Sequence, residues 1–184
     1  MAGRSGFTVA DLELMPDDLN RYEVIEGDLF ISDSSDLPHQ LVVHHFDRPI
    51  GNYLDHNLVG IAAPGPGVVF DEYNCVIPDL VFISNERRAQ VAGGEKVTGA
   101  PDIVIEVLSQ GPDNERRDRE VKRRLYAKFG VREYWIADLE NRRVEIYRLK
   151  DNVLDRVRTL GENDEITTDL LPGFRCSVQS IFKD

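Results

Sequence analysis

Residues 103–108 read Ile-Val-Ile-Glu-Val-Leu, an almost continuous run of β-branched and apolar side chains. Such a run predicts a strand that is covered on both faces, because a half-exposed strand alternates apolar and polar residues. The one charged residue in the run is Glu106. A buried carboxylate is costly unless it is paired, protonated or bound to a cation. Glu106 therefore indicates either a structural salt bridge or a functional site.

The segment that follows this strand predicts a helix over residues 113–129. Val121, Leu125 and Phe129 form its apolar stripe at helical spacing, and Gly130 ends it as a C′ residue. Residues 133–137 return to a strand pattern. A strand, a helix and a second strand in this order favour a sheet with a helix packed on it.

The remaining pattern places further strands around this unit. A hairpin is expected over residues 22–31 with its turn at Glu26-Gly27-Asp28, and a helix over residues 40–54 with an awkward Pro49 inside it. A short capped helix follows Thr8. The other expected strands are 59–63, 68–70, 80–83, 144–149, 153–160 and 174–178. The predicted class is α/β (α+β), with a mixed central sheet flanked by helices and additional N- and C-terminal antiparallel strands.

Length and composition favour one soluble globular domain over residues 1–184, with a net charge of −11. Disordered, coiled-coil and basic nucleic-acid-coating classes are excluded. We expect a cytoplasmic protein without a membrane segment, since no long apolar run or secretory signal is present. Cys75 and Cys176 lie 101 residues apart. This spacing favours reduced, buried thiols, although the sequence does not exclude a disulfide.

Two carboxylates besides Glu106 begin predicted strands, each directly after a proline. Asp102 is four residues before Glu106 on the same strand, roughly 13 Å away, so the two cannot share one metal; we interpret Asp102 as a strand-entry residue. Asp79 begins the strand at residues 80–83. If that strand is a neighbour of 103–108, Asp79 and Glu106 converge on one hard cation such as Mg²⁺.

Lys122 lies beside the apolar stripe of the predicted helix, with Asp118 and Tyr126 four residues away on either side. The aliphatic part of its side chain could be buried against this stripe while the ammonium group lies in a cleft, where it would offset the negative charge of a phosphate. The alternative is an exposed Asp118–Lys122 pair of little energetic weight.

The same helix holds a concentration of positive charge in an acidic chain. Residues 115–132 contain eight basic and three acidic side chains. Such a face could meet a polyanion, or it could be a solvated helix surface. The candidate nucleic-acid-binding residues are Arg116, Arg117, Arg119, Arg123 and Arg124.

These residues, in this order, resemble the Uma-two family of restriction endonucleases, within the PD-(D/E)XK nuclease superfamily. The resemblance is densest over Ala100–Ser109 and over the pattern Asp118-x3-Lys122-x3-Tyr126-x3-Gly130, continued by Glu133-Tyr134-Trp135 and Asp138. Shorter matches are Tyr22–Asp28, Pro38-His39, Pro78–Val81 and Leu171–Phe174, so that it covers nearly the whole chain.

The resemblance implies a restriction-endonuclease-like core and metal-dependent hydrolysis of phosphodiester bonds, with Mg²⁺ or Mn²⁺ as cofactor. It assigns Asp79 and Glu106 as metal ligands. The superfamily's usual lysine position is Leu108 here, and Lys122 fits the lysine that the family carries on the following helix. Glu23 and His39 match family positions and, with Tyr126, are candidates for an outer part of the site. For Glu23 a cross-strand pair, and for His39 a loop or helix-start position, remain alternatives.

Two functions from different classes are consistent with these residues. The first is a DNA endonuclease that acts as a homodimer, because cleavage of both strands requires paired sites. The second is a catalytically inactive nuclease-fold module that binds nucleic acid or a protein through its basic helix. Hydrolysis of another phosphoester would use the same site chemistry.

Overall fold

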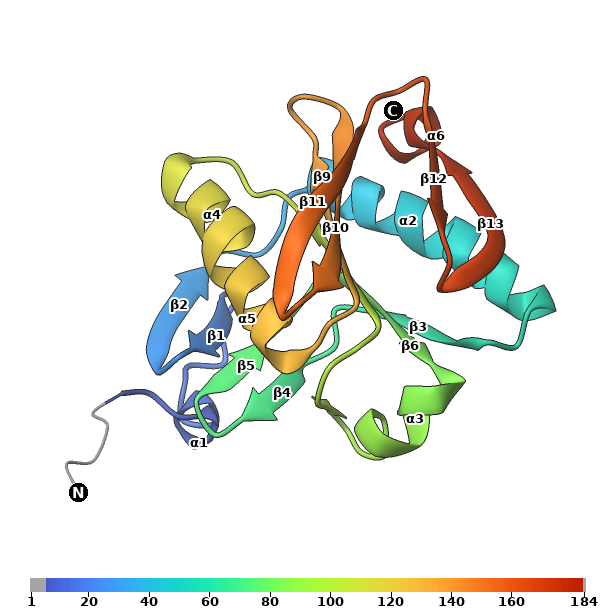
Figure 1. Ribbon diagram of the computed structural model, residues 1–184. Coiled ribbons are helices and arrows are strands. Elements are labelled where there is room, and N and C mark those ends of the chain that lie inside the picture. Colours follow the sequence, from blue (N-terminus) through green and yellow to red (C-terminus); the bar gives the residue numbers. More distant parts are fainter. Residues whose placement is uncertain (1–5, 184) are drawn as a thin grey trace.

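The computed structural model describes residues 6–183, and the strand at 103–107 lies inside its largest sheet (Figure 1). This sheet has six strands in the order β11-β10-β9-β8-β6-β3. β8 and β9 are parallel, and every other neighbouring pair is antiparallel. The bounds are β3 Gly60–Pro64, β6 Leu80–Ser84, β8 Ile103–Val107, β9 Glu133–Asp138, β10 Arg143–Lys150 and β11 Val153–Leu160.

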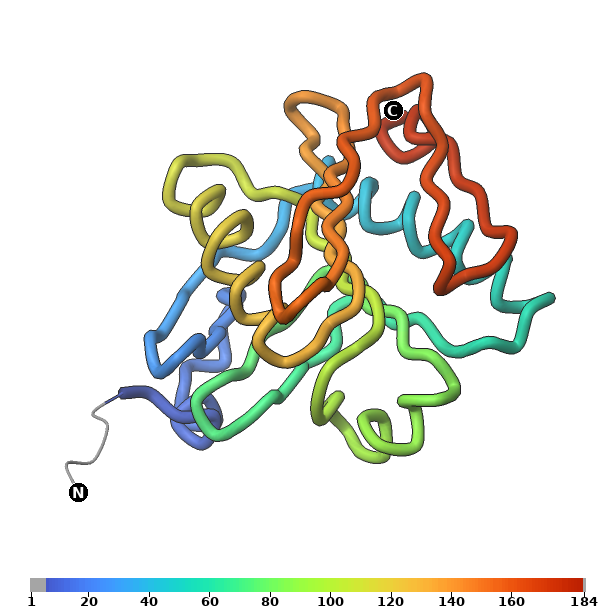
Figure 2. The backbone as a smooth tube through the Cα atoms, viewed as in Figure 1, coloured from blue at the N-terminus to red at the C-terminus, as the bar shows by residue number. Residues whose placement is uncertain are grey.

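Helices cover both faces of this sheet. One face, here called the α2 face, packs against α2 (Leu37–His56), α6 (Val178–Ile181) and the hairpin β12 (Glu165–Thr168)–β13 (Leu171–Ser177). The other, the α5 face, packs against the crossover between β8 and β9. Figures 1 and 2 show this crossover and α2 on opposite sides of the sheet. The crossover contains α4 (Pro112–Arg116), a π-helical turn η1 (Arg117–Lys122) and α5 (Arg123–Phe129).

Strand alternation assigns each residue of β8 to one of the two faces. Ile103, Ile105 and Val107 pack in the core on the α2 face, whereas Val104 packs in the core on the α5 face. Because successive side chains of a strand point to opposite faces, Glu106 also points to the α5 face. All five residues of β8 are buried, which confirms the prediction of a strand covered on both sides.

A second sheet of five strands, in the order β2-β1-β5-β4-β7, contributes to the core on the α5 face. Its hairpin turns at Glu26 (φ 54°) and Gly27 (φ 88°), the left-handed pair that a two-residue hairpin requires. Its strands are β1 Arg21–Ile25, β2 Asp28–Ser32, β4 Val68–Asp71, β5 Asn74–Val76 and β7 Val97–Thr98. Two short helices, α1 (Val9–Leu12) and α3 (Asn85–Val91), complete the fold.

The predicted mixed sheet flanked by helices is confirmed, with differences in individual elements. The helix expected over residues 40–54 runs from Leu37 to His56, and Pro49 lies inside it without ending it. The buried face of α2, with Val42, Phe46 and Ile50, holds the helix together across the missing N–H of Pro49. The strands β5, β7 and β12 and the helices α3 and α6 were not predicted, since each is short and lacks a periodic signal.

The prediction of one continuous α-helix over residues 113–129 is wrong in one respect. The segment is helical throughout, but it contains the π-helical turn η1, which introduces one extra residue. Gly130 ends it with a φ of 85°, as predicted for a C′ glycine. Among the described residues, no helix is both long enough and apolar enough to cross a membrane.

Candidate active site

The pairing of β6 with β8 brings Asp79 and Glu106 together. Leu80 lies opposite Ile105 in this antiparallel pair, so Asp79, one residue before Leu80, falls next to Glu106. The backbone N–H of Val107 donates to Asp79 Oδ2 at 2.8 Å and fixes the carboxylate against β8. Both carboxylates are buried. The condition under which Asp79 and Glu106 could share a cation, that their strands are neighbours, is therefore met.

Lys122, the last residue of η1, reaches Glu106 from the crossover. Its Nζ lies 2.9 Å from Glu106 Oε1 and 3.1 Å from Glu23 Oε1, and the side chain is buried. The alternative of an exposed Asp118–Lys122 pair does not occur, because Asp118 is itself buried and pairs with Arg117. Burial alone would lower the pKa of Lys122, but the surrounding carboxylates, Glu106 first, raise it. The lysine is thus held as a buried ammonium ion.

Tyr126 contacts the same oxygen of Glu106 from the next turn. Its hydroxyl donates to Glu106 Oε1 at 2.7 Å. Oε1 therefore receives two donors, whereas Oε2 accepts no hydrogen bond from residues 6–183. This asymmetry leaves one oxygen of a buried carboxylate open toward the pocket that Glu106 lines.

Three residues from the N-terminal part complete the cluster. The Glu23 carboxylate accepts the N–H of Ile77 at 2.7 Å in addition to Lys122. His39, in the first turn of α2, places Nε2 3.2 Å from Asp79 Oδ2, and Arg21 donates to Asp79 Oδ1 at 3.1 Å. Glu23 thus lies in direct contact with Lys122, and His39 with Asp79. Arg21 was not singled out in the sequence, where only its position two residues before Glu23 on one strand could have indicated it.

The two central carboxylates have opposite electrostatic environments. Burial raises the pKa of Glu106 to about 7, although the Lys122 ammonium opposes this. Burial would also raise the pKa of Asp79, but the hydrogen bond from His39, the charges of His39 and Arg21 and the Val107 N–H together lower it to about 2. The surroundings of Asp79 therefore favour its ionised form, whereas burial favours the protonated form of Glu106.

These side chains line one pocket of about 380 Å³. Its walls include Asp79, Glu106, Lys122, Glu23 and His39, and Tyr126 lies behind Glu106. Within residues 6–183, no group of three or more His, Cys, Asp or Glu side chains is arranged to hold a metal ion by itself. The donor set fits a hard cation that takes one or two carboxylate oxygens and completes its shell with water, as Mg²⁺ does. The open Oε2 of Glu106 is the donor that supports this fit.

Asp102 has a separate, structural place, as the sequence suggested. Its Oδ2 accepts the N–H of Ser84 at 2.6 Å, and Arg87 and Arg132 approach its Oδ1 at 3.4 and 3.2 Å. It joins the start of β8 to the start of α3 and to the end of α5.

The five arginines of the crossover do not form one free surface. Arg117 is buried beside Asp118, Arg119 binds Asp138 and Glu145, and Arg123 donates to the Leu154 carbonyl at 3.0 Å. Arg116 and Arg124 are exposed on the outer side of the helix. Binding of nucleic acid through these five residues stays a prediction.

The chain is an α+β protein whose mixed sheet carries two buried carboxylates on adjacent strands, with a lysine from the crossover helix in contact with one of them. The chain belongs to the Uma2 family, whose model is described as "Putative restriction endonuclease" and matches residues 9–179. This confirms the family resemblance seen in the sequence.

A crystal structure described as a putative nuclease belonging to DUF820 from Anabaena variabilis ATCC 29413 has the same fold. The similarity has a TM-score of 0.75 at 18% sequence identity and covers 96% of this chain and 97% of that chain. A search of curated protein sequences found no match.

Proposed function

We propose that this protein is a divalent-metal-dependent endonuclease that hydrolyses phosphodiester bonds of DNA. The observation that carries the proposal is the contact of Lys122 Nζ with Glu106 Oε1 at 2.9 Å, beside Asp79 on the neighbouring strand. Two acidic side chains and one ammonium ion in a single pocket are what metal-assisted phosphoryl transfer needs. The family description and the nuclease-like fold support the same reaction class.

Asp79 and Glu106 would hold the metal ion, Mg²⁺ or Mn²⁺. Bound there, the ion would supply a Lewis acid for a phosphoryl oxygen and an acidified water as nucleophile. Binding a cation requires ionised ligands. The surroundings of Asp79 favour this form, and a bound cation would favour it for Glu106 against the effect of burial.

Lys122 would stabilise negative charge on the scissile phosphate and position the attacking water. Its ammonium is held between Glu106 and Glu23 and needs no reorganisation to act. Tyr126 fixes the orientation of Glu106 through Oε1, which keeps the other carboxylate oxygen available. Arg21 and His39 fix the orientation of Asp79 through Oδ1 and Oδ2, respectively.

DNA is the proposed substrate, and cleavage of both strands would require a homodimer with paired sites. The proposed location is the cytoplasm. The two free, buried cysteines, Cys75 and Cys176, fit a reducing compartment.

The test is nicking of supercoiled plasmid with Mg²⁺ or Mn²⁺ by the wild type and by Glu106→Gln, which keeps the side-chain shape. We expect metal-dependent nicking that falls by about a thousandfold in the variant. Glu120→Gln is the matched control, since Glu120 is an exposed acid on the same crossover. Equal nicking by all three proteins would indicate a contaminant. DNA binding without cleavage under any metal would favour the inactive binding module.

A further inference from the structure

A second charged cluster lies on the α5 face, where β9, β10 and η1 meet. Two carboxylates form its interior: Glu145 on β10 is fully buried, and the side chain of Asp138 on β9 is only 3% exposed. Arg119 joins them, with one guanidinium nitrogen on Glu145 and another 3.0 Å from Asp138 Oδ2. Tyr147 also donates to Glu145, at 2.6 Å. Both carboxylates therefore have strong partners before any other arginine is considered.

Two more arginines approach the same carboxylates from the solvent side. Arg143 binds Asp138 through Nε and one terminal nitrogen, and its side chain is 39% exposed. Arg156 is 54% exposed and comes only to 3.7 Å from Glu145. Arg156 donates no side-chain hydrogen bond to residues 6–183. The carboxylates that Arg143 and Arg156 approach, Asp138 and Glu145, are buried. The part of this arginine pair that faces solvent therefore consists of guanidinium N–H donors. Glu115, a partly exposed acid, approaches Arg119 at 3.6 Å.

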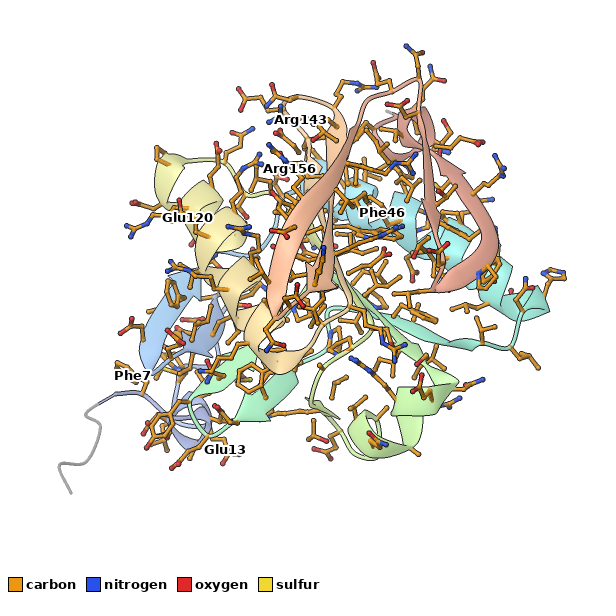
Figure 3. All side chains as sticks on the ribbon, viewed as in Figure 1. Phe7, Glu13, Phe46, Glu120, Arg143 and Arg156 are labelled. Carbon is orange, nitrogen blue, oxygen red and sulfur yellow. The ribbon has the colours of Figure 1, made fainter. Side chains whose placement is uncertain are left out.

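A β-bulge in β11 places Arg156 in this cluster. Tyr147 lies opposite Arg156 and Ile146 lies opposite Arg158, so Val157 has no partner on β10. Directly opposite residues share one face of a sheet. Arg156 therefore shares the α5 face with Tyr147, whereas Arg158 shares the α2 face with Ile146 and donates to Thr167. Figure 3 shows Arg143 and Arg156 near one another, on the side of the sheet toward α4.

The cluster adjoins the pocket of the candidate active site. Asp138, which Arg143 binds, is one of the residues lining that pocket, together with Glu115 from α4. Arg119 lies three residues before Lys122 on the crossover, about one helical turn away. A phosphate held by Arg143 and Arg156 would be close to one that lies in the pocket.

We infer that Arg143 and Arg156 bind a backbone phosphate of the DNA next to the one that is cleaved; this rests on the proposed function. An exposed guanidinium that is oriented by a buried carboxylate presents its remaining donors in the fork geometry that matches phosphate oxygens. A chain with a net charge of −11 needs such a local cationic contact to bind a polyanion. Of the three arginines that contact Asp138 or Glu145, these two are the more exposed and keep unused donors, whereas Arg119 is mostly buried.

The test measures binding of a fluorescently labelled DNA duplex in Mg²⁺ as a function of salt, with Glu106→Gln present in every protein to prevent cleavage. We expect Arg143→Gln/Arg156→Gln to bind about tenfold more weakly at low salt. The slope of log K against log[salt] should become shallower by about one for each phosphate that the variant no longer binds. Arg156→Lys, which keeps the charge but lacks the guanidinium fork, should keep the salt slope and lose part of the affinity.

Arg158→Gln is the matched control, because Arg158 is an exposed arginine two residues along the same strand but on the α2 face. An equal loss of affinity in Arg158→Gln, an unchanged slope in the double variant, or no binding by the parent protein would overturn this inference. The plasmid assay decides the proposed function separately. Nicking with an unaltered salt slope would leave the nuclease standing, whereas a shallower slope without nicking would leave only the phosphate contact.

Discussion

Lys122 shows how a single buried charge can be stable in this fold. An isolated ammonium ion inside a protein is strongly unfavourable, but here two carboxylates on different strands, Glu106 and Glu23, lie within 3.1 Å of Nζ. The arrangement is reciprocal, since each carboxylate also depends on the lysine. Removing one partner leaves buried charge without compensation, which is the costly event.

We predict that Lys122→Ala lowers the free energy of unfolding by about 3–5 kcal/mol, because Glu106 and Glu23 lose their cation. Urea denaturation at neutral pH without added metal measures this. Lys128→Ala is the control, since Lys128 pairs with Glu26 at the surface, with half of its side chain exposed, and should change stability by less than about 0.5 kcal/mol. Equal losses in the two variants would contradict the buried ion cluster.

The Tyr147 hydroxyl should make the stability of the fold depend on pH in the alkaline range. Burial and the hydrogen bond to Glu145 raise its pKa from 10.0 to about 12. The folded state then keeps a proton that the unfolded chain loses, so this contribution to stability is complete below about pH 10 and disappears as the pH rises to about 12. We expect the stability difference between wild type and Tyr147→Phe to shrink by about 1 kcal/mol over this window, allowing for solvent screening. Urea denaturation at several pH values measures it, and a constant difference would refute the raised pKa.

At the scale of elements, two features of the crossover helix matter: the π-helical turn within it and the glycine at its end. The π-helical turn η1 ends at Lys122, and the α-helical turn that follows carries Tyr126, so both side chains reach the same Glu106 oxygen. Gly130 then reverses the chain toward β9 in the left-handed conformation.

Two glycines allow the contribution of this conformation to be isolated. A Cβ added at Gly130 or at Gly51 would meet no atom within 4 Å, but only Gly130 has a positive φ, of 85°. We expect Gly130→Ala to destabilise the protein by about 1 kcal/mol. Gly51→Ala, inside α2, should stabilise it by about 0.5–1 kcal/mol. Thermal or urea unfolding of both variants measures this, and two changes of the same sign would be inconsistent with it.

At the scale of the whole molecule, the net charge is −11, yet the buried carboxylates of the two clusters described above are paired with basic side chains. The carboxylates of the two interior clusters, Glu106 with Glu23 and Glu145 with Asp138, each face lysine or arginine. The partly exposed Arg143 and Arg156 lie beside the second of these clusters. Such a local arrangement reconciles an acidic protein with an anionic substrate, because only the local field at the site has to be attractive.

The cysteines report on opening of the whole fold. Cys75 on β5 and Cys176 on β13 are both buried, and burial raises the pKa of each thiol. We predict that a thiol reagent modifies them only through unfolding, and that modification is about a hundredfold faster in a variant destabilised by about 3 kcal/mol, such as Lys122→Ala. Absorbance of the released reagent measures the rates. Rapid modification of the native wild type would show that one of these thiols is accessible without unfolding.

Local patterns in the sequence were sufficient for the central strand, the hairpin at Gly27, the end of the crossover helix at Gly130 and the family. These features depend on neighbours within a few residues, where alternation, turn residues and helical spacing act directly. The same patterns, with the family resemblance, singled out Asp79, Glu106 and Lys122. The short strands β5 and β12 had no such pattern, since three or four residues are too few to show a period.

By itself the sequence determined that Glu106 is a buried carboxylate, that the chain turns at Gly27 and Gly130, and which family the chain resembles. Only the tertiary structure decided that Asp79 lies beside Glu106 and that Glu23 is the second partner of Lys122. It also decided which arginines are paired inside the protein and which are partly exposed. The paired ones are Arg117, Arg119 and Arg123, and the partly exposed ones are Arg143 and Arg156. The reason is that the contacts of Lys122 alone join residues 16 and 99 positions apart. Their formation depends on strand order and on the packing of the crossover against the sheet, which no local periodicity encodes.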